Sequence, residues 1–220
     1  MAIAGRRTYL KELKTELQKA WPDNKSVNVL CHGHSVPAGY FAATYVDTFN
    51  AYPHLLHKSL KVLFPYSVIN VIVTAIGGEN SLNGSRRFEK EVLTHNPRVL
   101  TIDYCLNDRK LGLKEAEKSW RFMIEKALRK GLKIILLTPT MDITVIDKPK
   151  GSDAKILGVH AGQVRKLASE YSVGLADPFA VFKKHLRDTG DITDLLSWQN
   201  HPNRAGHEIV AREILRWFAY

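Results

Sequence analysis

The chain has 220 residues, of which 45% are hydrophobic and 25% charged, and its formal net charge is +10. This length and composition are typical of a single globular domain with a buried core. No apolar run reaches the roughly 18 residues that a membrane-spanning helix needs, so the sequence predicts no membrane span.

The positive charge is spread along the chain rather than gathered in one block. Basic residues recur near positions 11–25, 126–133, 148–155 and 183–187, and acidic residues lie between many of them. Interleaved charges of this kind are typical of solvated helix faces. No RNA-binding aromatic motif, helix-turn-helix pattern or zinc-finger spacing is present, so we expect no nucleic-acid partner.

The first 17 residues are polar and amphipathic, and they predict an N-terminal helix at about residues 6–20. They lack the apolar core of a signal peptide. We therefore expect a cytoplasmic location, unless a leader has been removed from the sequence. The sequence gives no indication of the oligomeric state.

Five apolar, β-branched runs follow one another along the chain, at residues 27–31, 68–75, 99–105, 133–138 and 173–176. Continuous apolar runs of this length favour parallel strands that are covered on both faces. Helical patterns lie between and after them, at residues 44–63, 86–95, 113–130, 154–171 and 202–218. This alternation predicts a three-layer α/β/α sandwich over residues 1–220, with a five-stranded parallel sheet. By analogy, we expect the flavodoxin-like strand order 2-1-3-4-5.

Candidate site residues follow the first three predicted strands where each strand ends. Ser35 follows the first strand, Gly78 the second and Asn107 the third. Parallel strands bring these positions to one edge of the sheet, where such folds bind ligands. His201 lies just before the last helix and would have to return to the same edge. Taken singly, each residue also fits a plain turn or helix-capping role.

These residue types together match the requirements of acyl transfer. A serine hydroxyl is a weak nucleophile until a neighbouring imidazole takes its proton. The oxyanion that then forms needs fixed, neutral donors. The backbone N–H groups of Ser35 and Gly78 and the side-chain amide of Asn107 could supply three, and a glycine at 78 allows a close approach of the backbone.

The Gly-His-Ser motif at residues 33–35, together with Gly78, Asn107 and His201, resembles the SGNH (GDSL-type) hydrolases in order and spacing. The resemblance covers nearly the whole chain. It implies a serine esterase of flavodoxin-like fold that uses no metal or other cofactor. It further implies that Ser35 is the nucleophile, Gly78 and Asn107 are oxyanion donors, and His201 is the general base.

The chain departs from the family pattern at two acidic positions. The family's Gly-Asp-Ser is Gly-His-Ser here, and the catalytic aspartate three residues before the histidine is replaced by Trp198. Some family members are similar in using a Ser–His dyad whose imidazole is oriented by a main-chain carbonyl. We predict that the carbonyl of Trp198 has this role. Asp194 and Asp191 are the alternative acids.

A metal site is the less favoured use of the histidines near the first strand. His32 and His34 could join His201, but this set lacks a convincing further ligand. Cys31 and Cys105 suit buried thiols and do not provide a disulfide framework or a clustered zinc site. The sequence therefore predicts no metal and no other cofactor.

The resemblance implies an esterase that hydrolyses small acyl esters, with acetyl esters on a carbohydrate as the expected substrate. Two alternatives stay open. The loss of both acidic residues would also suit a non-catalytic, ligand- or glycan-binding member of the family. An acyltransferase would use the same acyl-enzyme, and the sequence does not separate it from a hydrolase because the first half-reaction is shared.

Overall fold

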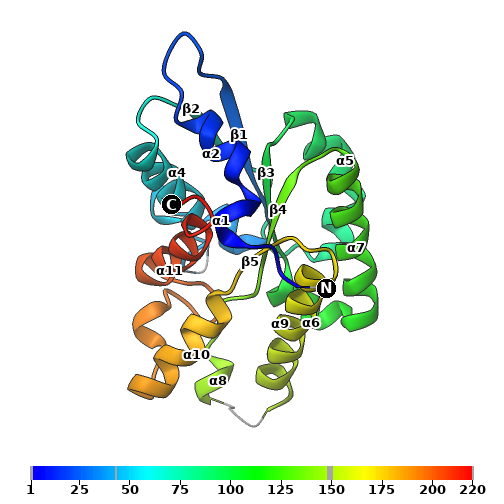
Figure 1. Ribbon diagram of the computed structural model, residues 1–220. Helices are drawn as coiled ribbons and strands as arrows, with labels where there is room; N and C mark the ends of the chain where they lie inside the picture. Colours follow the sequence, from blue (N-terminus) through cyan, green and yellow to red (C-terminus); the bar gives the residue numbers. More distant parts are fainter. Residues whose placement is uncertain (1, 43, 148–150, 220) are drawn as a thin grey trace.

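The computed structural model describes residues 2–42, 44–147 and 151–219. All five predicted strands are present, and they form one parallel sheet in the order β2-β1-β3-β4-β5 (Figure 1). The strands are β1 Ser26–Gly33, β2 Val68–Val73, β3 Val99–Asp103, β4 Lys133–Leu137 and β5 Gly174–Ala176. The predicted α/β/α architecture and the flavodoxin-like strand order are confirmed.

Helices connect the strands and cover both faces of the sheet. The α-helices are α1 Arg6–Tyr9, α2 Lys11–Leu17, α3 Ser35–Ala38, α4 Tyr52–Leu63, α5 Ser81–Glu91, α6 Cys105–Leu111, α7 Leu113–Arg129, α8 Thr144–Asp147, α9 Ser152–Glu170, α10 Pro178–Thr189 and α11 Arg204–Leu215. The described residues also form short 3₁₀ helices, which are η1 Thr48–Asn50, η2 Leu93–His95 and η3 Thr193–Leu195. The sequence patterns predicted neither α6 nor α10.

Each face of the sheet carries its own hydrophobic core. On one face, α5, α7 and the C-terminal half of α9 pack on Leu100 and Ile102, with Trp120 fully buried among them. On the other face, α2, α4 and α11 pack on Val29 and neighbouring strand residues (Figure 1). This double coverage explains why the strands are apolar runs rather than alternating ones.

The single N-terminal helix predicted at residues 6–20 is wrong in detail. The structure has two short helices, which are broken at Leu10 (φ −104°, ψ 17°) and end at Leu17. Leu10, Leu13 and Leu17 are all buried in the core.

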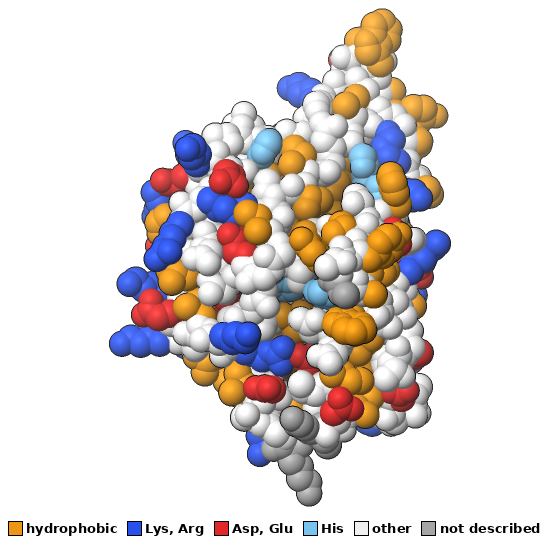
Figure 2. Space-filling model, turned by 180° about the vertical axis from the view of Figure 1, so that it is seen from behind, with side chains coloured by type: hydrophobic (Ala, Val, Ile, Leu, Met, Phe, Trp, Pro, Cys, Tyr) orange, Lys and Arg blue, Asp and Glu red, His pale blue; other side chains and the backbone are white. Residues whose placement is uncertain are grey.

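The surface carries mixed charges where the structure describes it. On the face shown in Figure 2, lysine and arginine side chains are interspersed with acidic ones. None of the helices in the described part of the chain is long and apolar enough to cross a membrane.

The carboxyl ends of β1 and β3 lie unusually close together. A Cβ atom at Gly33 would lie 2.4 Å from the carbonyl oxygen of Asp103, so a side chain at this position would clash with the backbone. The N–H of His34 donates to the same oxygen at 3.2 Å. The glycine before the predicted nucleophile therefore lets the strand end approach its neighbour.

Candidate active site

Ser35 is the first residue of the short helix α3, directly after β1. His34 caps this helix, because its Nδ1 accepts a hydrogen bond from the N–H of Val36 at 3.1 Å. Gly39 ends the helix in the left-handed conformation at φ 89°. This tight turn holds Ser35 at the strand end, where 7% of the residue is exposed.

His201 returns to this edge on a small hairpin that follows η3. The hairpin is closed by an antiparallel bridge between Leu196 and Pro202, and the N–H of Ser197 donates to the His201 carbonyl at 2.9 Å. The His201 Nε2 lies 3.0 Å from the Ser35 Oγ. The fold thus brings the predicted nucleophile and base into hydrogen-bonding contact, although 166 positions separate them.

The other ring nitrogen of His201 contacts a main-chain oxygen. Its Nδ1 lies 2.8 Å from the carbonyl of Phe41. Because a carbonyl can only accept, the Nδ1 must carry the proton, which leaves the Nε2 free to accept from the Ser35 hydroxyl. The imidazole is therefore held in the tautomer that a general base needs.

The prediction that Trp198 supplies this carbonyl is wrong. The hairpin directs the main chain of Trp198 toward the His201 carbonyl, to which its N–H lies at 3.4 Å, and not toward the imidazole. The residue is 51% exposed.

The two aspartates considered as alternative acids have other partners. The Asp194 Oδ1 lies 2.9 Å from the His185 Nε2. Asp191 accepts from the N–H groups of Ile192 and Thr193, at 2.7 and 2.9 Å, and so fixes the start of η3. Neither carboxylate has a contact with His201 in the structure.

Two of the predicted oxyanion donors, Gly78 and Asn107, lie on a loop and on helix α6 at the same edge of the sheet. Gly78 has φ 77°, in the left-handed region that favours glycine. The side-chain Nδ2 of Asn107, on α6, donates to the carbonyl of Glu79 at 2.9 Å, which brings Asn107 next to the Gly78 loop. The N–H of Ile76 donates to the Gly33 carbonyl at 3.1 Å, which ties that loop to the strand leading to Ser35.

Burial and a neighbouring histidine lower the pKa of the predicted base. Burial lowers the pKa of His201 from its ordinary value, and His34 lowers it further, although the bond to Phe41 acts in the opposite direction. His201 is therefore neutral at neutral pH and can accept a proton.

The histidine that replaces the family's aspartate before the nucleophile faces a carboxylate. This histidine is His34, and its Nε2 lies 3.3 Å from the Oδ1 of buried Asp103. The distance allows an ion-pair contact, but the two groups are not aligned for a hydrogen bond. An acidic group from β3 thus adjoins the position where the family has its own, and His34 holds the turn through its other ring nitrogen.

The three histidines considered as metal ligands have separate partners. The His32 Nδ1 lies 2.9 Å from the Thr74 Oγ1, and its Nε2 lies 3.1 Å from the Tyr104 hydroxyl. Within residues 2–42, 44–147 and 151–219, no group of three histidine, cysteine or acidic side chains is arranged to hold a metal ion.

Sequence reasoning missed two residues that support the base. The ring of Phe41 stacks on His207 of α11, with ring centroids 5.0 Å apart and 23° between the planes. The His207 Nδ1 accepts from the N–H of Tyr52 at 3.2 Å, and burial lowers its pKa to about 3. A main-chain acceptor leaves no side-chain signal in a sequence. The buried histidine could have been suspected only from its place on the apolar face of the last helix.

Comparisons with known proteins give a consistent result. The model of the GDSL-like lipase/acylhydrolase family matches residues 31–209. An acetylxylan esterase of Geobacillus stearothermophilus is 26% identical over 172 residues, which cover 71% of this chain and 75% of that one.

Solved structures share the fold at lower identity. The crystal structure of the Geobacillus enzyme has a TM-score of 0.76 at 23% identity and covers 88% of this chain and 94% of that one. A two-domain esterase active on acetylated mannans has a TM-score of 0.75 at 18% identity and covers 99% of this chain and 54% of that one. Variants of the Geobacillus enzyme that are described as catalytic mutants change a serine, an aspartate and a histidine.

Proposed function

This chain belongs to the GDSL-like lipase/acylhydrolase family, and from this premise we propose that it hydrolyses small acyl esters of carbohydrate, above all acetyl esters, through an acyl-enzyme on Ser35. Membership of the family makes the protein a serine carboxylic ester hydrolase. The observation that carries the proposal for the site is the contact of 3.0 Å between the Ser35 Oγ and the His201 Nε2, with the opposite ring nitrogen on the Phe41 carbonyl.

In the first half-reaction, the Ser35 Oγ attacks the ester carbonyl and its proton passes to the His201 Nε2. The imidazolium that forms is held by its Nδ1–H bond to Phe41. The negative oxygen of the tetrahedral intermediate would take hydrogen bonds from the Ser35 and Gly78 N–H groups and from Asn107. The Asn107 Nδ2 has two hydrogens and gives one to Glu79, so one is left for this oxygen.

The intermediate then collapses, the His201 Nε2–H protonates the leaving alcohol, and Ser35 keeps the acyl group, which completes the first half-reaction. In the second half-reaction, the same two residues act on the acyl-enzyme. Water then gives a proton to His201 and attacks the acyl carbonyl, which releases the acid and restores the Ser35 hydroxyl. An acyltransferase would differ only in the use of a second hydroxyl compound in place of water.

The substrate class rests on the relatives rather than on the site. The Geobacillus relative acts on acetylxylan by its name, and the two-domain relative is active on acetylated mannans. Both substrates are acetylated polysaccharides.

Two measurements test the proposal, which are covalent labelling of Ser35 and the release of acetate from a substrate. A fluorophosphonate should add to Ser35 alone, as shown by intact mass and peptide mapping, because His201 activates only that hydroxyl. Acetylated xylo-oligosaccharides should then release acetate. Labelling without acetate release, but with transfer of the acetyl group to an added sugar, would identify the transferase. A folded protein that binds these sugars but takes up no label would identify the binding protein.

The pH dependence of activity should follow the titration of His201. Because its pKa is lowered, kcat/KM should rise with pH to a plateau, with a midpoint below the ordinary histidine value of about 6.5. A midpoint at or above that value would contradict the buried, neutral base.

Burial also lowers the pKa of His32 and His207 to about 3. The unfolded chain therefore binds more protons than the folded protein below about pH 6.5, and the stability of the fold falls there. Intrinsic fluorescence at each pH should therefore confirm that the protein is folded.

Neither upstream aspartate should be essential. Removing the aspartate of a true catalytic triad lowers kcat about 10⁴-fold. Asp194→Asn and Asp191→Asn should each lower kcat less than about tenfold, because their partners are His185 and the backbone of η3. Steady-state kinetics on p-nitrophenyl acetate, with thermal unfolding as the control for folding, measure this. If kcat fell about 10⁴-fold in either folded variant, that aspartate would be the third member of a catalytic triad.

A further inference from the structure

We propose that Glu79 is a positioning residue for this reaction, and that it fixes the Gly78 N–H through a buried network with His32, Thr74, Arg87 and Tyr104. We call these five residues the Glu79 network. The inference deepens the proposed function and rests on it, since Gly78 matters only if an oxyanion forms beside Ser35.

The loop that carries Gly78 is fixed before this residue, because the Ile76 N–H donates to the Gly33 carbonyl and Gly77 lies close to the Tyr40 ring. Gly78 itself has no such neighbour, since a Cβ there would meet no atom within 4 Å. Glu79 is the next residue along the chain, and only 8% of it is exposed. Glu79 therefore anchors the Gly78 peptide from its other side.

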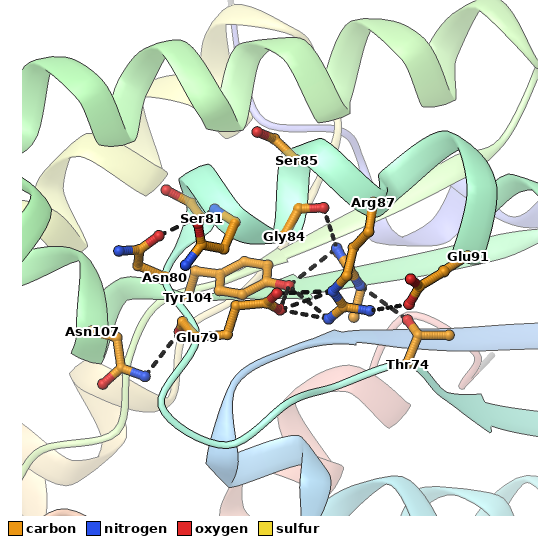
Figure 3. Close-up of polar contacts among 12 residues, drawn as sticks. Thr74, Glu79, Asn80, Ser81, Gly84, Ser85, Arg87, Glu91, Tyr104 and Asn107 are labelled. Carbon is orange, nitrogen blue, oxygen red and sulfur yellow. Dashed lines mark hydrogen bonds and ion pairs between the residues drawn. The ribbon is translucent and has the colours of Figure 1, made fainter.

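Glu79 is held by its side chain and by its main chain (Figure 3). Its carboxylate accepts from the Arg87 Nε at 2.9 and 3.1 Å and from the Tyr104 hydroxyl at 2.8 Å. Its carbonyl accepts from the Asn107 Nδ2 at 2.9 Å. One residue thus joins the loop of Gly78 to the other predicted oxyanion donor.

The network connects this loop to the central strands. Tyr104 directly follows β3, and its hydroxyl lies 3.1 Å from the Nε2 of His32 on β1. The same Nε2 lies 3.3 Å from the Gly84 carbonyl on α5, and the Nδ1 lies 2.9 Å from the Thr74 Oγ1. The Gly84 carbonyl can only accept, so the Nε2 is placed to donate to it.

Close packing and charge balance keep the network in one arrangement. A Cβ at Gly84 would lie 2.2 Å from the Tyr104 hydroxyl oxygen, so α5 can approach this closely only with glycine there. Burial lowers the pKa of His32 to about 3, and it is neutral. The charges in the network are then those of buried Glu79 and partly buried Arg87, which form an ion pair that further hydrogen bonds support.

An anchor of this kind acts on the transition state more than on substrate binding. Oxyanion donors accelerate a reaction because they are fixed before the charge develops. A loosened Gly78 should therefore lower kcat while KM changes little, because the ground-state ester needs no such donor.

The chain offers a matched pair of variants that test this. Glu79→Gln and Glu91→Gln both remove a carboxylate that pairs with Arg87, but Glu91 is on α5 at the surface and does not contact the loop. Glu79→Gln should lower kcat for p-nitrophenyl acetate by about 10- to 100-fold, with KM within about threefold. It should slow fluorophosphonate labelling of Ser35 by a similar factor. Glu91→Gln should change kcat, KM and the rate of labelling by less than about twofold each.

Two further readouts separate positioning from a purely structural role. The pH midpoint of kcat/KM should be the same in Glu79→Gln as in the wild type, because the Ser35–His201 pair is untouched. If Glu79→Gln does not fold, Tyr104→Phe decides, because it keeps the ion pair and removes one hydrogen bond to the carboxylate. This variant should lower kcat at least about threefold with KM unchanged.

The outcomes distinguish this inference from the proposed function. A wild-type protein without labelling at Ser35 would overturn the proposed function and the inference with it. Labelling of the wild type and of folded Glu79→Gln at equal rates, with equal kcat, would overturn the inference alone. For the case in which Tyr104→Phe decides, a kcat within twofold of the wild type would do the same.

Discussion

Replacing Ser35 by alanine should lower kcat by about 10⁶, the size of loss found when a serine hydrolase loses its nucleophile. His201→Ala should cause a loss of similar size, because the hydroxyl attacks only when the imidazole takes its proton. The double variant should be no worse than either single one, because the two residues act as one unit. Activity on p-nitrophenyl acetate and fluorophosphonate labelling measure these losses.

The control variant is Ser59→Ala, which removes a hydroxyl that bonds only to its own helix in the structure. It should keep full activity. Circular dichroism and thermal unfolding should show that Ser35→Ala is folded, since a strand-end hydroxyl contributes little to the core. If folded Ser35→Ala kept more than about a hundredth of the activity, another nucleophile would be at work.

The second large effect is expected at Asn107. Asn107→Ala should lower kcat by about 10²–10³, the typical loss when one fixed oxyanion donor is removed. The effect has two sources, because this amide also bonds to the Glu79 carbonyl beside Gly78. KM should change much less than kcat, as measured by steady-state kinetics on acetyl esters.

Asn28 provides the matched control for this prediction. Its Nδ2 also donates to a main-chain carbonyl, that of His95 at 2.7 Å, but near the opposite edge of the sheet. Asn28→Ala should change kcat less than about twofold. A loss of only a few-fold in Asn107→Ala would show that Asn107 is a turn residue and not an oxyanion donor.

The architecture was predictable because its signals are local. A parallel sheet that is covered on both faces needs apolar runs, and all five runs became strands in the expected order. Boundaries were less accurate, since the third predicted strand ran into α6, which begins at Cys105. The helix α10 was missed although Asp177 and Pro178 mark its start as a cap and a first-turn proline.

The site was predictable only where it depends on side-chain identity. The Gly-His-Ser motif and His201 indicated the family and the proposed reacting pair, and family membership is confirmed. Glu79 and Arg87 are eight positions apart and could equally be a surface pair, so their burial under Tyr104 is a property of packing that no local pattern contains. The partner of the His201 Nδ1 is a peptide oxygen, which every residue possesses.

That peptide oxygen gives the enzyme an orienting group that is independent of residue type. Any amino acid at position 41 would bring the same atom, so substitution cannot delete it as it deletes a carboxylate. What holds this oxygen in place is the backbone beside it, where the Phe41 N–H donates to the Tyr45 carbonyl and the Asp47 N–H to the Gly39 carbonyl. Inserting or removing a residue between Gly39 and Phe41 would displace the acceptor. An amide oxygen also stays unprotonated in mild acid, so the direction of the imidazole does not change as the medium acidifies.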